Sequence, residues 1–193
     1  RSEEDMRIIA GSVKGRQLKA PKGRHLRPTA ARVKEALFNI LPHDLSGLRV
    51  LDLFAGTGNL SVEALSRGAA EAVLIDAATE AGKVIRENLR AVGFSDKAKV
   101  WVAPVLKSTR LLARRGERFD LIFLDPPYEK DWVGKTLRAV AQEGLLRETG
   151  ILVVEHSMRE KVEKDYAPLR LRDQRRYGTT LLSFFEHCPS EIL

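Results

Sequence analysis

The chain has 193 residues, enough for one domain with its own hydrophobic core, or for a domain with a short appendage. Hydrophobic residues make up 44% and charged residues 31%, which excludes fibrous, low-complexity and membrane-spanning classes. No apolar stretch of the kind found in secretory signals follows the first residues. A single cysteine, Cys188, and four scattered histidines allow neither an internal disulfide nor a zinc cluster. We expect a cytoplasmic protein without a metal site.

The formal net charge of +7 is concentrated near the amino terminus. Residues 6–34 contain nine lysines and arginines and no acidic residue, which leaves a net charge of −2 for the rest of the chain. Glycines and prolines interrupt this segment and predict an extended or hairpin arm rather than a helix. Such an arm is suited to contact nucleic-acid phosphates, although a solvated basic face would carry the same charge.

The remaining sequence alternates between amphipathic segments and short apolar runs. Apolar residues at three-to-four spacing predict helices over 29–41, 59–68, 79–92, 105–115 and 132–143. The apolar runs predict strands over 48–54, 72–75, 100–103, 119–124 and 150–154. Two further strands, 169–176 and 181–185, are expected to form an antiparallel pair at the end of the chain. This alternation predicts an α/β fold with a largely parallel, doubly wound sheet.

Ligands of such sheets bind beyond the carboxyl ends of the strands. The first predicted strand ends in a run from Asp52 to Gly58, in which Gly56 and Gly58 allow the backbone to approach a ligand closely. The second strand ends at Asp76, an acid suited to the two hydroxyls of a ribose. Ser61 stands where a dinucleotide fingerprint has its third glycine, and no phosphate-loop lysine follows. These features fit S-adenosylmethionine, with Asp52 near its ammonium group and the glycine turn along its methionine part.

The fourth predicted strand ends in Asp125-Pro126-Pro127-Tyr128, the most specific signal in the chain. Two prolines fix two φ angles and remove two backbone donors, so the turn is stiff. It presents a carboxylate, a backbone carbonyl and an aromatic ring to one planar group. Methylation of an exocyclic amine needs these groups: Asp125 and the Pro126 carbonyl accept the amine hydrogens, and Tyr128 stacks on the base. The alternative is that the turn has a structural role only, as a rigid proline turn with a packed tyrosine.

With these motifs in hand, the sequence resembles the bacterial small-subunit ribosomal RNA guanine-N(2)-methyltransferases of the RsmD type over nearly all of residues 6–186. The matching blocks are 7–11, 14–16, 27–29, 32–39, 52–58, 63–69, 125–128 and 176–179. The two turns occur throughout amino-methyltransferases, whereas the amino-terminal blocks are specific to the family. The resemblance implies a Rossmann-like class I methyltransferase with a mostly parallel seven-stranded sheet, an antiparallel final strand, and a basic amino-terminal β-hairpin and helix.

The resemblance also implies roles for individual residues. Thr29 and Arg32 are expected to close over the methionine end of the cofactor, and the arm to bind ribosomal RNA. The predicted cofactor site consists of Thr29, Arg32, Asp52, Phe54, Gly56, Thr57, Gly58 and Asp76. The predicted RNA contacts are Arg7, Lys14, Arg16, Lys19, Lys22, Arg24 and Arg27. The predicted catalytic residues are Asp125, Pro126, Pro127 and Tyr128.

The chain departs from the family pattern at two points. Many relatives have Glu at the end of the second strand, where this chain has Asp76, which has a shorter reach and the same hydroxyl chemistry. Relatives often place Asp or Asn after the third strand to meet the adenine amine. Here the stretch is Ala103-Pro104-Val105, so we expect backbone groups to make that contact.

We expect a basic arm and helix over residues 1–45, a methyltransferase domain over 46–188 and a tail over 189–193. The expected reaction is methylation of the 2-amino group of an unstacked guanine in 16S ribosomal RNA, within the small subunit or its assembly intermediate. A DNA adenine amino-methyltransferase would use the same proline turn, but 193 residues leave little room for a DNA-reading domain. A protein-glutamine methyltransferase would not need the basic arm. A non-catalytic RNA-binding scaffold would not need both turns intact. We expect a monomer.

Overall fold

The computed structural model describes residues 6–20, 28–127 and 131–188. The helices are α1 (Pro28–Ile40), α2 (Asn59–Ser66), α3 (Thr79–Val92), α4 (Val105–Arg114) and α5 (Trp132–Gln142), with a short 3-10 helix, η2 (Ser95–Lys97). The strands are β1 (Arg49–Leu53), β2 (Glu71–Asp76), β3 (Ala98–Val102), β4 (Phe119–Leu124), β5 (Leu146–Ser157), β6 (Asp165–Tyr166), β7 (Leu169–Tyr177) and β8 (Thr180–His187). They form one sheet in the order β3-β2-β1-β4-β5-β8-β7-β6.

The strand order confirms the predicted Rossmann-like fold. Strands β1 to β5 pair in parallel, whereas β8 pairs antiparallel with both β5 and β7. The order reverses at β1, which lies between β2 and β4, and ligands of doubly wound sheets bind at such a reversal. The sheet has eight strands instead of seven because the two-residue β6 pairs with β7 at the edge. A strand that short has no periodic pattern that could predict it.

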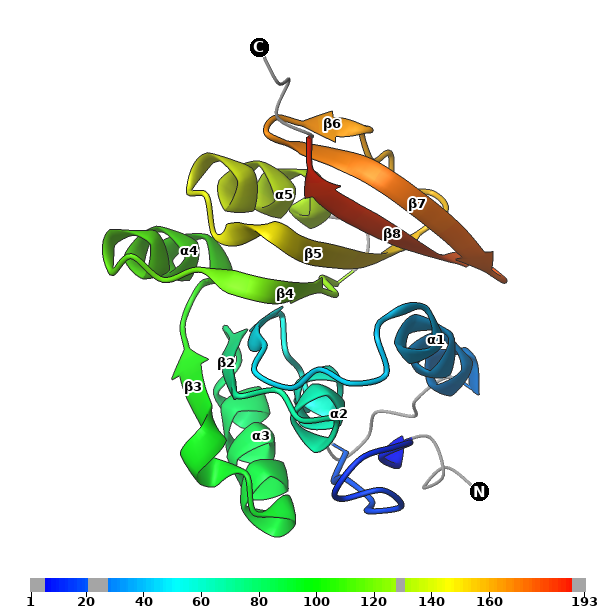
Figure 1. Ribbon diagram of the computed structural model, residues 1–193, viewed down its shortest axis with the longest axis vertical. Helices are drawn as coiled ribbons and strands as arrows, with labels where there is room; N and C mark the ends of the chain where they lie inside the picture. Colours follow the sequence, from blue (N-terminus) through cyan, green and yellow to red (C-terminus); the bar gives the residue numbers. More distant parts are fainter. Residues whose placement is uncertain (1–5, 21–27, 128–130, 189–193) are drawn as a thin grey trace.

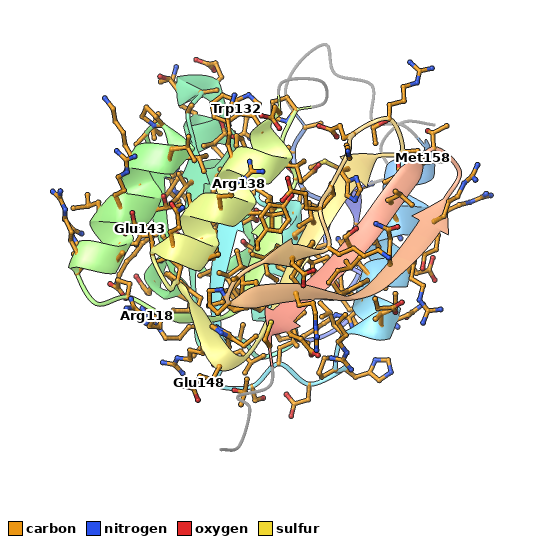
Figure 2. The ribbon with its side chains drawn as sticks, turned by 90° about the horizontal axis from the view of Figure 1, so that it is seen from above. Arg118, Trp132, Arg138, Glu143, Glu148 and Met158 are labelled. Atoms are coloured by element: carbon orange, nitrogen blue, oxygen red, sulfur yellow. The ribbon has the colours of Figure 1, made fainter. Side chains whose placement is uncertain are left out.

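Helices cover both faces of the sheet (Figure 1). Alternate side chains of β1 point to opposite faces, so Val50 packs with α1, α2 and α3, whereas Leu51 packs with α4 and α5. Both faces of the parallel strands are therefore buried, which explains why their sequences are continuous apolar runs. Figure 2 shows Trp132 and Met158 on the side where β4 and β5 end, and Arg118 and Glu148 on the opposite side, where these strands begin.

The amino-terminal arm forms the predicted β-hairpin over residues 6–18. Arg7 and Gln17 form an antiparallel bridge, and the Ile8 N–H donates to the Arg16 carbonyl at 2.9 Å. Three apolar side chains of the hairpin are buried in the same core as α1 and α2; they are Met6, Ile8 and Leu18. Gly11 turns the hairpin at φ 85°, and a Cβ there would lie 1.8 Å from the Ser66 carbonyl oxygen. Only glycine fits this contact.

In the part of the chain that the structure describes, no helix combines the length and the apolar character needed to span a bilayer.

Candidate active site

The predicted motifs meet at the carboxyl edge of β1, β2 and β4. Leu53, at the end of β1, is in register with Ile75 of β2 and with Leu124 of β4. The next residues therefore lie side by side; they include Asp76, the last residue of β2, and Asp125, which directly follows β4. The Asp125 N–H extends this pairing by donating to the Leu53 carbonyl at 3.4 Å. Motifs far apart in the sequence thus share one edge of the sheet.

The glycine turn after β1 has left-handed backbone at three positions. Phe54, Gly56 and Gly58 have φ values of 64°, 58° and 77°. Glycine adopts this conformation readily, whereas Phe54 is strained there, and strained residues of this kind cluster at functional sites. The Phe54 ring packs edge-on against Trp132, with 5.7 Å between the ring centroids. The turn ends at Gly58, which precedes α2, so the amino-terminal end of that helix belongs to the site.

Asp76 joins the end of β2 to the glycine turn. Its Oδ2 accepts a hydrogen bond from the Gly56 N–H at 2.9 Å, and its Oδ1 accepts one from the Ala78 N–H at 2.9 Å. Each carboxylate oxygen can accept further hydrogen bonds, and the side chain is partly exposed. These two backbone donors orient the carboxylate so that both oxygens remain available to a diol.

Asp52 is buried beneath the same edge. It is 2% exposed and accepts a hydrogen bond of 2.7 Å from the Ser61 Oγ of α2. Burial raises the pKa of Asp52 to about 7; the Ser61 hydrogen bonds oppose the rise, and the charges of Asp125 and Asp76 add to it. Its placement near the ammonium group of a cofactor stays a prediction. Sequence reasoning read Ser61 only as a missing glycine and did not anticipate this hydrogen bond.

Asp125 differs from Asp52 in that the residue as a whole is exposed, although protein atoms surround its carboxyl group. Desolvation by the surrounding protein atoms raises the pKa of Asp125 to about 7. Pro126 is buried and Pro127 is exposed, so the proline turn begins anchored in the fold and continues toward solvent. Tyr128 lies outside the described residues.

The other predicted cofactor residues lie on α1 and in the glycine turn. Arg32 is exposed on α1 and makes no hydrogen bond or ion pair with another described residue. Thr29 belongs to α1, but its side chain is outside what the structure describes. The Thr57 carbonyl accepts a hydrogen bond of 3.0 Å from the Nδ2 of Asn88.

Four of the seven predicted RNA contacts are exposed on or directly after the hairpin; they are Arg7, Lys14, Arg16 and Lys19. The Lys19 Nζ also forms an exposed ion pair of 3.0 Å with Glu87. The other three, Lys22, Arg24 and Arg27, lie outside the described residues.

Lys34, counted in the basic segment by its sequence position, is buried. Its Nζ lies 2.9 Å from the Oε2 of Glu63, and burial lowers its pKa, an effect that Glu63 partly opposes. Lys34 therefore contributes to packing, and the basic surface is smaller than the sequence indicates. No sequence pattern distinguished it from its exposed neighbours.

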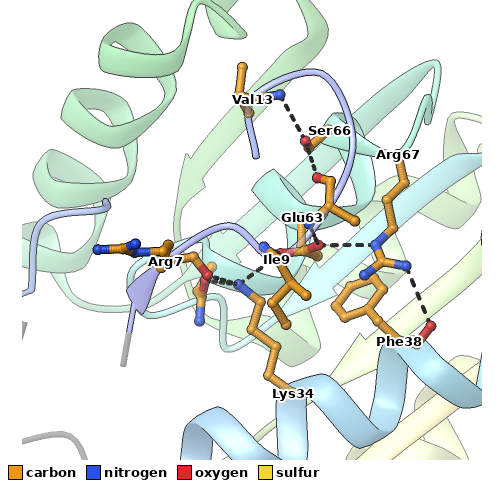
Figure 3. Close-up of polar contacts among 10 residues, drawn as sticks. Arg7, Ile9, Val13, Lys34, Phe38, Glu63, Ser66 and Arg67 are labelled. Atoms are coloured by element: carbon orange, nitrogen blue, oxygen red, sulfur yellow. Dashed lines mark hydrogen bonds and ion pairs between the residues drawn. The ribbon is translucent and has the colours of Figure 1, made fainter. Parts of the chain in front are cut away.

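Glu63 is the centre of the buried cluster that holds the hairpin (Figure 3). Besides Lys34, it binds the Arg67 Nε at 3.0 Å, and it accepts the backbone N–H groups of Ile9 and Ala10 at 2.8 and 3.0 Å. The Arg67 guanidinium lies over the Phe38 ring of α1, 4.8 Å from its centroid. Four donors satisfy one fully buried carboxylate, so the hairpin, α1 and α2 form one unit.

Four features together define a Rossmann-like class I methyltransferase. They are the parallel sheet whose strand order reverses at β1, the glycine turn, Asp76 at the end of β2, and the Asp-Pro-Pro turn after β4. The family model described as "Conserved hypothetical protein 95" matches residues 6–186, and the chain belongs to this family, which is of the RsmD type.

Proteins similar to this chain in sequence and in structure carry methyltransferase names. The Bacillus subtilis protein YlbH, provisionally named an rRNA methyltransferase, is 35% identical over 181 residues, which cover 94% of this chain and 98% of YlbH. Ribosomal RNA small subunit methyltransferase D of Escherichia coli K12 is 36% identical over 152 residues, covering 78% of this chain and 74% of that protein. The solved structure of E. coli yhhF, provisionally named a methyltransferase, has a TM-score of 0.82 at 31% identity and covers 94% of this chain and 97% of its own.

The cofactor of this methyltransferase is S-adenosylmethionine. The site fits it chemically: the oriented Asp76 carboxylate suits a ribose diol, and the glycine turn has no side chain at Gly56 to obstruct a bound molecule. The stretch 103–105 after β3 offers no polar side chain, so the contact to the adenine amine remains assigned to backbone groups as a prediction.

Proposed function

We propose that the protein transfers the methyl group of S-adenosylmethionine to the 2-amino group of a guanine in 16S ribosomal RNA. The observation that carries the proposal is the position of Asp125, an exposed residue that directly follows β4 and lies beside the glycine turn and Asp76. The name of the E. coli relative, small subunit methyltransferase D, supports ribosomal RNA as the substrate. The proposal includes a monomeric, cytoplasmic enzyme that acts on the small subunit or its assembly intermediate.

Catalysis by the chain's own residues consists of orientation and charge stabilisation. The bound cofactor supplies an electrophilic methyl group. The lone pair of a guanine 2-amino group is delocalised into the ring, so the nitrogen is a weak nucleophile. Asp125 and the Pro126 carbonyl would accept its two hydrogens, which favours a more tetrahedral nitrogen and stabilises the positive charge that develops there. The methylated nitrogen then loses one proton, to the Asp125 carboxylate or through it to water. Tyr128 would stack on the base.

The hairpin supplies a binding surface outside the catalytic edge. The four exposed basic side chains on the hairpin or directly after it are suited to phosphate groups, and they read no base sequence by themselves. A guanine 2-amino group lies within the stacked helix, so the base must be turned out of a loop or bulge to reach Asp125. Contacts to the phosphate backbone and capture of one unstacked base together define the proposed substrate.

A DNA adenine amino-methyltransferase remains the second candidate, because the Asp-Pro-Pro turn suits any exocyclic amine on a base. The experiment that separates the candidates offers labelled S-adenosylmethionine and the full chain to unmodified small subunits, naked 16S ribosomal RNA and unmethylated DNA. Label in 2-methylguanosine from subunits or RNA supports the proposal. Label in 6-methyladenine from DNA replaces it with the second candidate. No label in any nucleic acid, with cofactor binding intact, rejects both.

A further inference from the structure

Asn88 is a buried amide that joins the basic arm to the glycine turn. It lies on the core-facing side of α3 among Ile85 and Leu89, and it is 1% exposed. Its Oδ1 accepts the Lys19 N–H at 2.7 Å, while its Nδ2 donates to the Lys19 carbonyl at 3.1 Å and to the Thr57 carbonyl at 3.0 Å. Both amide hydrogens are used. The two carbonyls and one N–H around the amide fix its orientation.

A second contact lies on the other side of the same turn. The Lys34 Nζ donates to the Oδ1 of Asn59 at 2.7 Å and to the carbonyl of Arg7 at 3.1 Å. Asn59 directly follows Gly58 and begins α2. Residues on both sides of Gly58 are therefore connected to the arm, Thr57 through Asn88 and Asn59 through Lys34. The arm thus supports the turn that meets the cofactor.

We propose that Asn88 is a positioning residue that couples cofactor binding at the glycine turn to RNA binding at the arm; this inference rests on the proposed function. A ligand that fixes the turn fixes the Thr57 carbonyl, which orients the Asn88 amide and orders Lys19 next to the exposed cations. An ordered arm loses less conformational entropy when it meets RNA, which raises affinity. Since linkage is reciprocal, RNA must raise the affinity for the cofactor by the same factor.

The first test uses the affinity of the full chain for a 16S ribosomal RNA transcript, with and without saturating S-adenosylhomocysteine. In the wild-type protein we expect the nucleoside to tighten RNA binding by about fivefold or more, the lower range of coupling between sites. Asn88→Ala removes the link, and Asn88→Asp is nearly isosteric but places an oxygen against the carbonyls of Lys19 and Thr57. Both should reduce the ratio to near one. Glu87→Gln, which breaks only the exposed pair with Lys19, should keep the wild-type ratio.

A wild-type ratio of one, or a ratio that persists in both Asn88 variants while their melting temperatures fall, would overturn the proposal, because Asn88 would then be merely structural. A second measurement needs no variant and no RNA. S-adenosylhomocysteine alone should slow hydrogen exchange at the Lys19 amide, which is bonded to Asn88. Unchanged exchange there contradicts the coupling. Failure of methyl transfer to RNA together with a slowed Lys19 amide would instead reject the proposed substrate and leave the link between arm and turn intact.

Discussion

Ser61 donates a hydrogen bond of 2.7 Å to Asp52, and neither side chain is more than 2% exposed. The serine stands where a dinucleotide-binding turn would have a third glycine, and it gives the buried acid its hydroxyl partner. The hydrogen bond lowers the cost of holding a carboxylate under the catalytic edge, although burial still raises the pKa of Asp52 to about 7. Two neighbouring acids thus have raised pKa values: Asp52 beneath the site and Asp125 at it.

Replacing Asp125 with alanine is expected to remove methyl transfer while leaving cofactor affinity within a few-fold of the wild-type value. The carboxylate acts on the developing charge of the amine, and loss of one such group costs roughly 100- to 1,000-fold in kcat. Single-turnover rates with 16S ribosomal RNA and calorimetry with S-adenosylhomocysteine measure the two quantities. Glu148→Ala, at the opposite edge of the sheet (Figure 2), serves as the control and should leave both unchanged. Transfer that largely survives Asp125→Ala would exclude the amine-acceptor role.

The rate of transfer should rise as the pH increases through about 7, because Asp125 must be ionised to accept the amine hydrogens and its pKa is raised to about 7. Below that pH the carboxyl is protonated, and above it the rate should level off. Asp52→Asn removes a neighbouring negative charge, which favours ionisation of Asp125 and moves the midpoint of the profile to lower pH. The pH dependence of single-turnover rates checks both statements. The range from about pH 5 to about pH 9 brackets this titration. A rate that does not change over that range contradicts both statements.

Neutralising the exposed hairpin cations should weaken RNA binding and flatten its salt dependence. Lys14→Gln with Arg16→Gln removes two charges that carry no ion pair among the described residues. If both contact phosphates, the slope of log affinity against log salt falls by roughly 0.7 to 0.9 for each contact. Lys107→Gln with Arg110→Gln, on α4 at the other face of the sheet, is the matched control. Filter binding over a series of salt concentrations measures the slopes, and an equal change in both double variants would show that net charge alone is responsible.

Glu63→Gln is expected to lower the free energy of unfolding by about 3 to 5 kcal/mol, the usual cost of removing one partner from a buried ion pair. The change leaves Lys34 and Arg67 buried without their counter-charge, and it weakens the acceptors that hold Ile9 and Ala10. Urea denaturation measures the effect. Glu80→Gln breaks the exposed pair with Lys83 and should change stability little. Similar losses in the two variants would mean that the Glu63 cluster does not anchor the hairpin.

Local patterns in the sequence were enough to predict most of the fold. The spacing of apolar residues predicted α3 at 79–92 and β4 at 119–124 with the bounds that the structure has, because the periods of helix and strand are properties of neighbouring residues. Glycine and proline turns predicted where the chain would meet a ligand, since each turn follows directly after a strand. An extended or hairpin arm was predicted for the same reason, from the glycines and prolines that interrupt short apolar stretches.

The tertiary structure decided which side chains are buried and which distant residues they meet. Lys34 and Lys14 look alike in the sequence, yet Lys34 is buried against Glu63 and Lys14 is exposed. The bond between Ile9 and Glu63 spans 54 positions, and the bond between Lys19 and Asn88 spans 69. The sequence by itself determined the elements and the turns, because these depend on local conformational preference. Only the folded chain decided which charges reach solvent and which groups join the arm to the site, because burial and pairing depend on contacts between residues far apart in the sequence.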